Sequence, residues 1–330
     1  MLPGDPAQMM LGQNEDSEQL ALVKQKYGFD KPISTQYLYY INDLSPISFH
    51  SNEVEDYTFL RDGKYSSTSL FSMGNTTTVL KYPYLRESFT KQGKKVSEVL
   101  AETLPNTFVL AITAIVIAII LGIFLGIISA LFKDKWLDKT IQIFSTFGMS
   151  IPSFFSAILF AWFFGYILHK YTNLEMTGSL YELDDFGEAM HIKWKNLILP
   201  AIVLGIRPLA VVIQLMRNSL LEVFNQDYIR TARAKGLSEF QIIRRHALKN
   251  AMNPVVTAIS GWFASMLAGA VFVEYIFGWN GLGKEIVNAL NTLDLPVIMG
   301  SVLIIALLFT IINIFVDLIY VWLDPKVKLE

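Results

Sequence analysis

The sequence predicts an all-α protein that crosses a membrane several times. Of its 330 residues, 52% are hydrophobic and 17% are charged, and the mean hydropathy is +0.40. A soluble domain usually carries about 25% charged residues, so this chain is short of side chains that face water. A helix that spans a bilayer needs about 20 apolar residues. Five runs meet this length: Thr103–Phe132, Thr140–Leu168, Asn196–Met216, Asn250–Val273 and Leu295–Leu323.

The charge balance and the cysteine count exclude several other classes. The formal net charge is −2, so no bulk attraction to nucleic acid is expected. The chain has no cysteine, which excludes disulfides, metal sites with cysteine ligands and lipid anchors on cysteine. The cysteine count leaves open which compartment the loops face.

Residues 1–102 precede the first apolar run and are expected to form a water-exposed segment of mixed or irregular structure. Ser17–Gly28 has a helical pattern of apolar residues. Lys31–Tyr84 is rich in Ser, Asn, Asp and Thr with interspersed aromatic residues, a mixture typical of a small module with short strands. Such a module could dock a partner or serve only as a lid. Lys91–Val99 is predicted to be a short interfacial helix that leads into the first span.

Two residues inside the apolar runs are candidates for the wall of a pathway. Pro152 lies in the second run, where proline kinks a helix and frees carbonyl groups that can line a cavity; a kink that serves only packing is the alternative. Arg207 interrupts the third run, and a cation inside a span costs about 3 kcal/mol on insertion scales. It is expected to face a cavity or partner, or else to reach the membrane surface. Glu274 and Asp317 are expected to be interfacial or interhelical partners.

The distribution of Lys and Arg predicts the orientation in the membrane. Twelve cations lie in the loop after the first run, in the segment between the third and fourth runs, and after the last run. The loops on the other side carry four: Lys170, Lys193, Lys195 and Lys284. The side with twelve cations, which includes the C-terminus, is therefore predicted to be cytoplasmic, and residues 1–102 to be extracytoplasmic.

The stretch Arg217–Pro254 is strongly cationic and lies between two apolar runs. It holds seven Lys and Arg residues against three Asp and Glu residues, a formal net charge of +4. Asp227 is predicted to cap a short helix over Tyr228–Lys235, and Gly236 to end that helix in the left-handed conformation. Ser238 is followed three residues later by glutamine, the pattern of a capping box that opens a second helix. The stretch should therefore form a compact helical hairpin in the cytoplasm.

No motif in the sequence indicates a catalytic, nucleotide or metal site. Gly278–Lys284 fits the first seven positions of a phosphate-binding loop, but Glu285 stands where Ser or Thr would bind magnesium, and no strand is expected before it. The loop from His169 to Lys195 holds two histidines and several carboxylates without the spacing of a metal site. The chain is therefore expected to be no enzyme and to bind no metal or cofactor itself.

Two parts of the cationic stretch carry a resemblance to a known family: Gln226–Ser238 (QDYIRTARAKGLS) and Arg245–Ala251 (RHALKNA). They are similar to the permease subunits of binding-protein-dependent ABC importers, in the dipeptide, oligopeptide and nickel branch. The general signature of these importers is Glu-Ala-Ala, three residues, Gly, and then Ile-x-Leu-Pro. Here Arg230 and Thr231 replace the Glu and the first Ala, and no Pro follows Leu248. This departure is itself typical of the peptide branch.

Shorter matches to this family extend the resemblance over most of the chain. They are Leu2–Pro6, Lys26–Pro32, Gln36–Leu38, Leu104–Thr107, Trp136–Asp138, Ser150–Phe154, Gly281–Gly283 and Asp324–Val327. Residues 42–80 resemble an insertion. Members of the family have six spans, and the first ends at the segment that opens here at Met1. The first span is therefore expected to be missing, which leaves the five predicted above.

The resemblance implies how the chain is divided and where it works. Residues 1–102 would be the extracytoplasmic segment, residues 103–324 the transmembrane permease domain, and residues 325–330 a cytoplasmic tail. The protein would lie in the inner membrane and form half of a pathway with a second, similar permease. A binding protein would deliver the solute, and two cytoplasmic ATPase subunits would use ATP and magnesium.

The resemblance also assigns a role to residues 217–253, here called the coupling segment. Its short helix would dock in a groove on an ATPase subunit, with Tyr228, Ile229 and Leu237 as apolar anchors and its cations against an acidic rim. The residues expected to make this contact are Tyr228, Ile229, Arg230, Thr231, Ala232, Arg233, Ala234, Lys235, Gly236, Leu237 and Ser238.

The solute stays open between peptides and a smaller species such as nickel, because the binding protein largely selects it. From a different class, a secondary transporter would need inverted repeats and paired charges inside the membrane. The sequence shows neither pattern.

Overall fold

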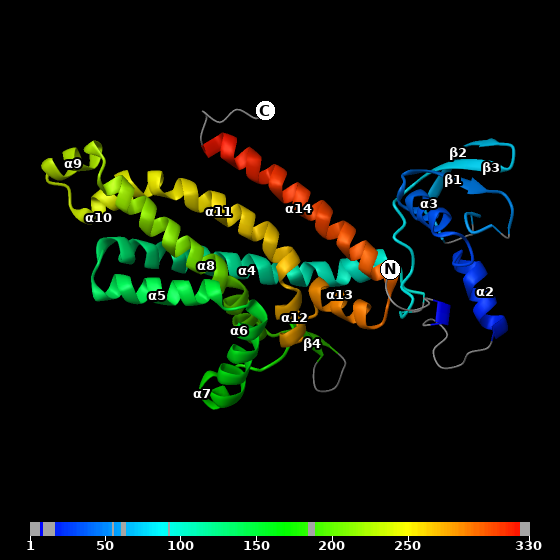
Figure 1. The fold of residues 1–330 in the computed structure, drawn as a ribbon, viewed down its shortest axis with the longest axis horizontal. Helices are drawn as coiled ribbons and strands as arrows, with labels where there is room; N and C mark the ends of the chain where they lie inside the picture. The colour runs from blue at the N-terminus through cyan, green and yellow to red at the C-terminus, as the bar shows by residue number, and fades with distance from the viewer. Residues whose placement is uncertain are drawn as a thin grey trace. The chain divides into compact units, whose positions relative to one another are not determined.

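The computed structural model of the chain describes residues 7–8, 17–54, 56–60, 64–91, 93–183 and 189–323. The chain forms two compact units. Unit 1 contains Met1–Glu102 and Ile286–Leu303, and unit 2 contains Thr103–Glu285 and Ile304–Glu330. Figure 1 shows the helices and strands by their labels.

Several expectations fall outside the described residues. They concern the match at Leu2–Pro6, the acidic residues Asp184, Asp185 and Glu188 in the loop that follows the second span, the match at Asp324–Val327 and the tail 325–330. Asp317 lies in a described helix, but its side chain is outside the described part of the structure.

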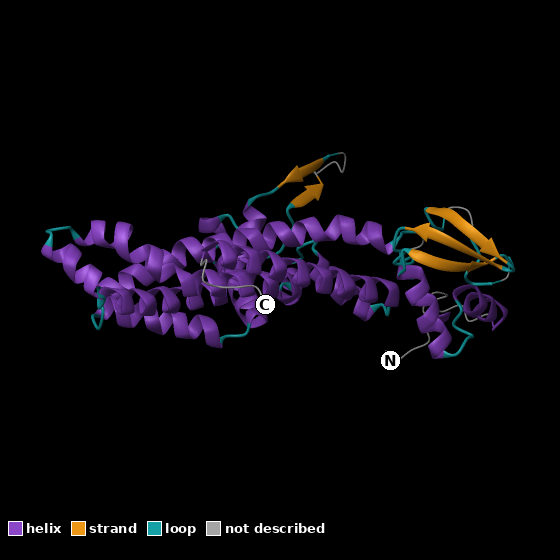
Figure 2. Ribbon diagram, turned by 90° about the horizontal axis from the view of Figure 1, so that it is seen from above, coloured by secondary structure: helices purple, strands orange, loops and turns teal. Residues whose placement is uncertain are grey.

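Unit 1 contains a small module built from two helices and a sheet. Its elements are α2 (Ser17–Tyr27), α3 (Ile33–Leu44), β1 (Ile47–Ser51), β2 (Ser67–Met73) and β3 (Thr76–Lys81). The strands pair antiparallel in the order β1-β3-β2 (Figure 2). The helix and the short strands expected here are confirmed, whereas α3 was not predicted, because its aromatic-rich sequence suits strands as well.

The polar residues of this module surround one buried carboxylate. Asp43 is 1% exposed and accepts hydrogen bonds from the hydroxyls of Tyr57 at 2.9 Å and Tyr65 at 2.8 Å, and from Arg86 Nε at 2.9 Å. Burial, and next the nearby Asp43 charge, raise the pKa of both tyrosines above the usual value of 10.0. Both hydroxyls therefore stay protonated and donate to the carboxylate.

The remaining elements are mostly helices. They are α4 (Val96–Leu131), α5 (Trp136–Ser150), α6 (Ser153–Phe160), the π-helix η1 (Ala161–Ile167), α7 (His169–Thr172), β4 (Tyr181–Leu183), β5 (Met190–Ile192), α8 (Lys195–Phe224), α9 (Asp227–Ala234), α10 (Glu239–Ile242), the π-helix η2 (Ile243–Ala247), α11 (Leu248–Gly269), α12 (Val271–Phe277), α13 (Leu282–Asn291) and α14 (Leu295–Leu323). Strands β4 and β5 form a two-stranded hairpin.

Three helices in the described residues are long and apolar enough to cross a membrane: Val96–Leu131, Lys195–Phe224 and Leu295–Val316. Two bent pairs pass the same test when each pair counts as one span, which raises the number to as many as five. The all-α polytopic fold expected from the five apolar runs is confirmed. The first span differs in one respect from the short helix expected over Lys91–Val99, because helix α4 begins at Val96 and the described residues 91 and 93–95 before it are not helical.

Pro152 does more than kink the second span. Helix α5 ends at Ser150 and α6 starts at Ser153, with an angle of 109° between the two arms. Pro152 has φ −60° and ψ 140° and is the N-cap of α6. Because proline lacks an N–H group and the residue before it avoids the helical region, the chain breaks here into two helices.

Helices α4 and α8 approach each other closely in unit 2. A Cβ atom added at Gly122 would lie 2.6 Å from Val212, and one added at Gly126 would lie 2.7 Å from Met216. Such distances are shorter than real Cβ contacts, so only glycine fits at these two positions. The two glycines lie one turn apart on α4, and because they lack a side chain they let the backbones of α4 and α8 approach closely along this contact.

Candidate functional site

The coupling segment contains two short helices, α9 and α10, which lie between the end of α8 and the π-helix η2 that leads into α11 (Figure 1). Helix α9 covers Asp227–Ala234, one residue earlier at both ends than expected. Gln226, not Asp227, is the N-cap, and its side chain makes no capping bond. The prediction that Asp227 caps the helix is therefore wrong: Asp227 already has helical geometry, and its carboxylate lies 3.5 Å from Arg230 on the same exposed face.

The turn between α9 and α10 has the predicted geometry. Gly236 has φ +78°, in the left-handed region that favours glycine. Ser238 Oγ accepts from the backbone N–H of Gln241 at 3.4 Å, and Gln241 Oε1 accepts from the backbone N–H of Ser238 at 3.0 Å. This reciprocal pair is a complete capping box, so the local sequence alone defines where α10 begins.

One face of α9 packs against the rest of the protein. Ile229 is fully buried and Ala232 is 5% exposed, and they share an apolar cluster with Leu220, Val223 and Ile242. Leu237 is half-buried against the same cluster. Ile229 was expected to be an apolar anchor for a partner, but it anchors α9 to α8 and α10 instead.

The other face is exposed and combines aromatic rings with cations. Tyr228 is 40% exposed and Phe240, the second residue of α10, is 71% exposed. Arg230, Thr231, Ala234, Lys235 and Ser238 are exposed as well. Arg233 Nε lies 3.0 Å from Glu239 Oε1, which bridges the two short helices. This face is here called the outer face of the coupling segment, and it offers two aromatic rings together with cations, two of which are paired with the exposed carboxylates Asp227 and Glu239.

Phe240 was not among the residues expected to contact a partner. It is an apolar side chain in the first turn of α10, and its exposure contrasts with Ile242 of the same short helix, which is fully buried. Tyr228 was expected, and its hydroxyl accepts a 2.8 Å hydrogen bond from Asn250 Nδ2 at the start of α11.

The two candidate pathway residues lie near each other. Arg207 on α8 is exposed, and its Nη2 atom lies 3.5 Å from the carbonyl oxygen of Met149. Met149 is in the last turn of α5, directly before the break at Pro152, where unpaired carbonyls and the helix dipole attract a cation. A pathway role for either residue stays a prediction.

The loop that resembles a phosphate-binding motif already holds a carboxyl group from the chain itself. The Glu274 side chain is fully buried, and its Oε2 atom accepts from the backbone N–H groups of Gly283 at 2.7 Å and Lys284 at 3.2 Å. Thr107 on α4 donates to Oε1 at 2.7 Å. Glu274, which lies in α12, thus joins its own helix to α4 and to the start of α13, as expected of an interhelical partner.

The apolar helices and the capped turn between α9 and α10 define the class of this protein. It is a polytopic helical membrane protein with a helical hairpin between two spans. The sequence profile described as "Binding-protein-dependent transport system inner membrane component" matches residues 122–329. The profile of the N-terminal part of the same membrane components matches residues 1–53. The chain belongs to this family of multi-pass inner-membrane transport components.

Curated relatives cover nearly the whole chain. The dipeptide transport system permease protein DppB of Alkalihalophilus pseudofirmus is 33% identical over 341 residues, covering 99% of this chain and 91% of the relative. The glutathione transport system permease protein GsiC of Salmonella choleraesuis is 30% identical over 328 residues, covering 99% of this chain and 90% of the relative. The resemblance to importer permeases is therefore confirmed at the level of the family.

A solved structure shows the same fold. The inward-facing MetNI methionine ABC transporter superimposes with a TM-score of 0.55 at 16% identity, covering 69% of this chain and 97% of that chain. At this identity the likeness shows the fold alone. The part of this chain that superimposes has the helical architecture of that structure.

Proposed function

We propose that this chain forms one half of the translocation pathway of an ATP-driven peptide importer. The relatives named as dipeptide and glutathione permeases support peptides over nickel or another small solute, because both names describe peptidic substrates. The partners are a second, similar permease, a binding protein that delivers the peptide, and two cytoplasmic ATPase subunits that use ATP and magnesium.

The observation that carries the proposal is the outer face of the coupling segment. Tyr228 on α9 and Phe240 on α10 are exposed, and so are the cations Arg230 and Lys235 of the same segment. Aromatic side chains often contribute much of the binding energy when a pocket of the partner covers them. Charged side chains around them orient the partner as it binds. This face docks on the ATPase subunit, and the C-terminus of the chain lies on the same cytoplasmic side.

Phe240→Ala tests the docking role, because it removes the most exposed aromatic ring of the face without touching the buried contacts of α9. We expect at least tenfold weaker co-purification of the ATPase subunits, consistent with about 2 kcal/mol for an interface anchor. Phe124→Ala, which removes an exposed ring from α4, is the matched control and should leave co-purification unchanged. Equal retention of the ATPase subunits by both variants would refute the docking role.

The orientation is tested by labelling single cysteines in intact cells, since the chain has none of its own. Ser238 and Glu175 are both exposed, whereas Ser179 in the same loop as Glu175 is 4% exposed and unsuitable. We expect Glu175→Cys to react with an impermeant maleimide and Ser238→Cys to react only after the membrane is opened. The reverse pattern would overturn the orientation.

A further inference from the structure

An ion pair inside unit 2 joins the start of α5 to the later part of α8. Arg217 Nε donates to Asp138 Oδ1 at 2.7 Å, and Arg217 Nη2 donates to Asp138 Oδ2 at 2.7 Å. Two parallel bonds between planar groups fix orientation as well as distance. The side chain of Asp138 is 3% exposed and that of Arg217 is 18% exposed, so water competes little for either group.

Other groups converge on the same carboxylate. Ser129 Oγ, near the end of α4, donates to Asp138 Oδ1 at 2.5 Å, and the backbone N–H of Asp134 donates to Oδ2 at 2.9 Å. Gln142 Nε2 in turn donates to Ser129 Oγ at 3.1 Å. Three helices and the turn between α4 and α5 therefore meet at one side chain, which is the partner of the arginine.

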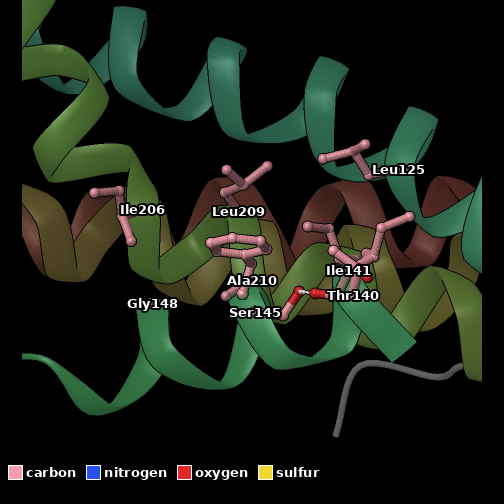
Figure 3. Close-up of a pocket in the computed structure, with 10 residues that line it drawn as sticks. Leu125, Thr140, Ile141, Ser145, Gly148, Ile206, Leu209 and Ala210 are labelled. Carbon is pink, nitrogen blue, oxygen red and sulfur yellow. Dashed lines mark hydrogen bonds between the residues drawn. The ribbon is translucent and has the colours of Figure 1, made fainter. Parts of the chain in front are cut away.

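Beyond the ion pair, α5 packs against α8 around a hollow. A cavity of about 300 Å³ opens between α4, α5 and α8 (Figure 3). It is lined by Leu125, Thr140, Ile141, Phe144, Ser145, Gly148, Ile206, Leu209, Ala210 and Ile213. At its far end the helices touch again, since a Cβ atom added at Gly148 would lie 2.9 Å from Ile206. The packing of α5 against α8 therefore has a gap, and the ion pair joins the first turn of α5 to α8.

Arg217 is also close in sequence to the coupling helices. Helix α8 ends at Phe224, and α9 starts three residues later at Asp227. Leu220, between Arg217 and that end, packs in the same cluster as Ile229 of α9. A displacement of α9 therefore moves the last turns of α8 and carries Arg217 with them.

We propose that the Asp138–Arg217 ion pair is the joint that makes α5 follow α8 when the coupling segment is displaced. The motion reaches the far end of α5, where the chain breaks at Pro152 and Arg207 approaches the Met149 carbonyl. Asp138 and Arg217 are positioning residues, and Arg217 is not one of the cations that meet the ATPase subunit. The proposal rests on the proposed function, because it takes the ATPase subunits as the source of the displacement.

The joint is tested in proteoliposomes with the assembled complex, by measuring ATP hydrolysed per radiolabelled alanyl-alanine imported. Asp138→Asn keeps the shape of the side chain and removes its charge, and Arg217→Lys keeps the charge and removes the second bond. For both we expect this ratio to rise at least tenfold, with ATPase subunits still bound. Asp30→Asn, in an exposed ion pair with Lys31, is the control and should leave the ratio unchanged.

A purely stabilising ion pair predicts a different result. It would lower the yield and the unfolding temperature of both variants, but the assembled fraction would hydrolyse the wild-type number of ATP molecules per peptide. That outcome would refute the proposal that the ion pair makes α5 follow α8. Conversely, cross-linking Asp138→Cys to Arg217→Cys with a reducible reagent should restore the ratio, and adding reductant should raise it again; failure to restore it would also refute the joint.

A second measurement separates failure of the joint from failure of the proposed function. Spin labels on Phe144→Cys in α5 and Ser238→Cys near α9 report the distance between the two helices without any solute. The joint predicts one narrow distance distribution in the otherwise native chain and a broadened one with Asp138→Asn. If uptake is absent in the wild type but Asp138→Asn broadens the distribution, the proposed solute is wrong and the joint stands. Identical distributions would refute the joint itself.

Discussion

Asp43 and Asp138 are both buried carboxylates paired with an arginine, but they connect different kinds of structure. Asp43 lies in unit 1, and its partners Tyr57, Tyr65 and Arg86 all come from the same small module. Asp138 lies in unit 2 and joins helices that are distant in the sequence, with Arg217 on α8. The same chemistry therefore closes a local core in one region and links long elements in the other.

This difference concerns what is lost when the charge is removed. A buried ion pair adds little net stability over a well-packed apolar pair, but loss of one partner leaves an uncompensated charge. Around Asp43 an uncompensated charge would destabilise a module that has only a small apolar core. This module can unfold locally while the rest of the protein stays folded. Around Asp138 the apolar contacts of α4 with α8 remain, so the helices stay assembled while their relative positions become less defined.

Asp43→Ala should have the largest effect on stability. It leaves Arg86 and two tyrosine hydroxyls without their acceptor, which costs about 3–5 kcal/mol for a broken buried pair. We expect amide hydrogens of β1, β2 and β3 to lose protection from exchange by a factor of at least a hundred. ATP hydrolysed per peptide should stay at the wild-type value. A changed ratio would show that the module takes part in coupling. It would contradict the statement that Asp43 acts only within its own module.

Removing a single hydrogen-bond donor should have a smaller effect, and the effect should differ between Asp43 and Asp138. Tyr65→Phe removes one donor to Asp43, and Ser129→Ala removes one donor to Asp138, each at a cost of about 1 kcal/mol. We expect Tyr65→Phe to lower only the protection of the module, measured by hydrogen exchange. Ser129→Ala should raise the ATP-to-peptide ratio by a few-fold without a loss of protection. The two carboxylates would be equivalent if both variants changed the same quantity.

The smallest effect concerns pH and the module alone. His50 is fully buried, its Nδ1 atom donates to the Thr58 carbonyl at 2.6 Å, and its Nε2 atom accepts from Ser48 Oγ at 2.8 Å. Burial lowers the pKa of His50 below the usual 6.5, and the Thr58 hydrogen bond partly offsets this shift.

Because the unfolded module binds the proton more readily than the folded one, its stability is complete above pH 6.5 and declines as the pH falls through the lowered pKa. Hydrogen exchange at pH 5 to 7.5 should show this decline, with rates corrected for their intrinsic pH dependence. His50→Gln should flatten it. A decline that persists in the glutamine variant would assign the pH dependence to another group.

The coupling segment was largely predictable from the sequence because its signals are local. Gly236 marks the left-handed turn, and the capping box of Ser238 and Gln241 needs only residues three apart. The exception is the N-cap of α9, predicted at Asp227 but found at Gln226. Aspartate favours both the N-cap and the first turn of a helix, so its identity does not separate the two positions.

The role of each cation in the coupling segment was not predictable in the same way. Arg217, Arg230 and Arg233 are equivalent in a count of charge, yet one is inside the protein, one is exposed, and one bridges α9 to α10. The partner of Arg217 lies 79 residues earlier in the chain. Nothing in either local sequence indicates that Asp138 and Arg217 meet.

The sequence by itself determined the membrane class, the five apolar runs, the capped hairpin and the family resemblance, because hydropathy, capping and motif spacing act over short distances along the chain. Only the tertiary structure decided that Ile229 faces inward, that the Glu274 side chain fills the loop resembling a phosphate-binding motif, and that Asp138 binds Arg217. These are contacts between helices, and they depend on which face each helix turns towards its neighbour. That choice is made by packing across the whole unit, for example where Gly126 lets α4 approach Met216 of α8 closely.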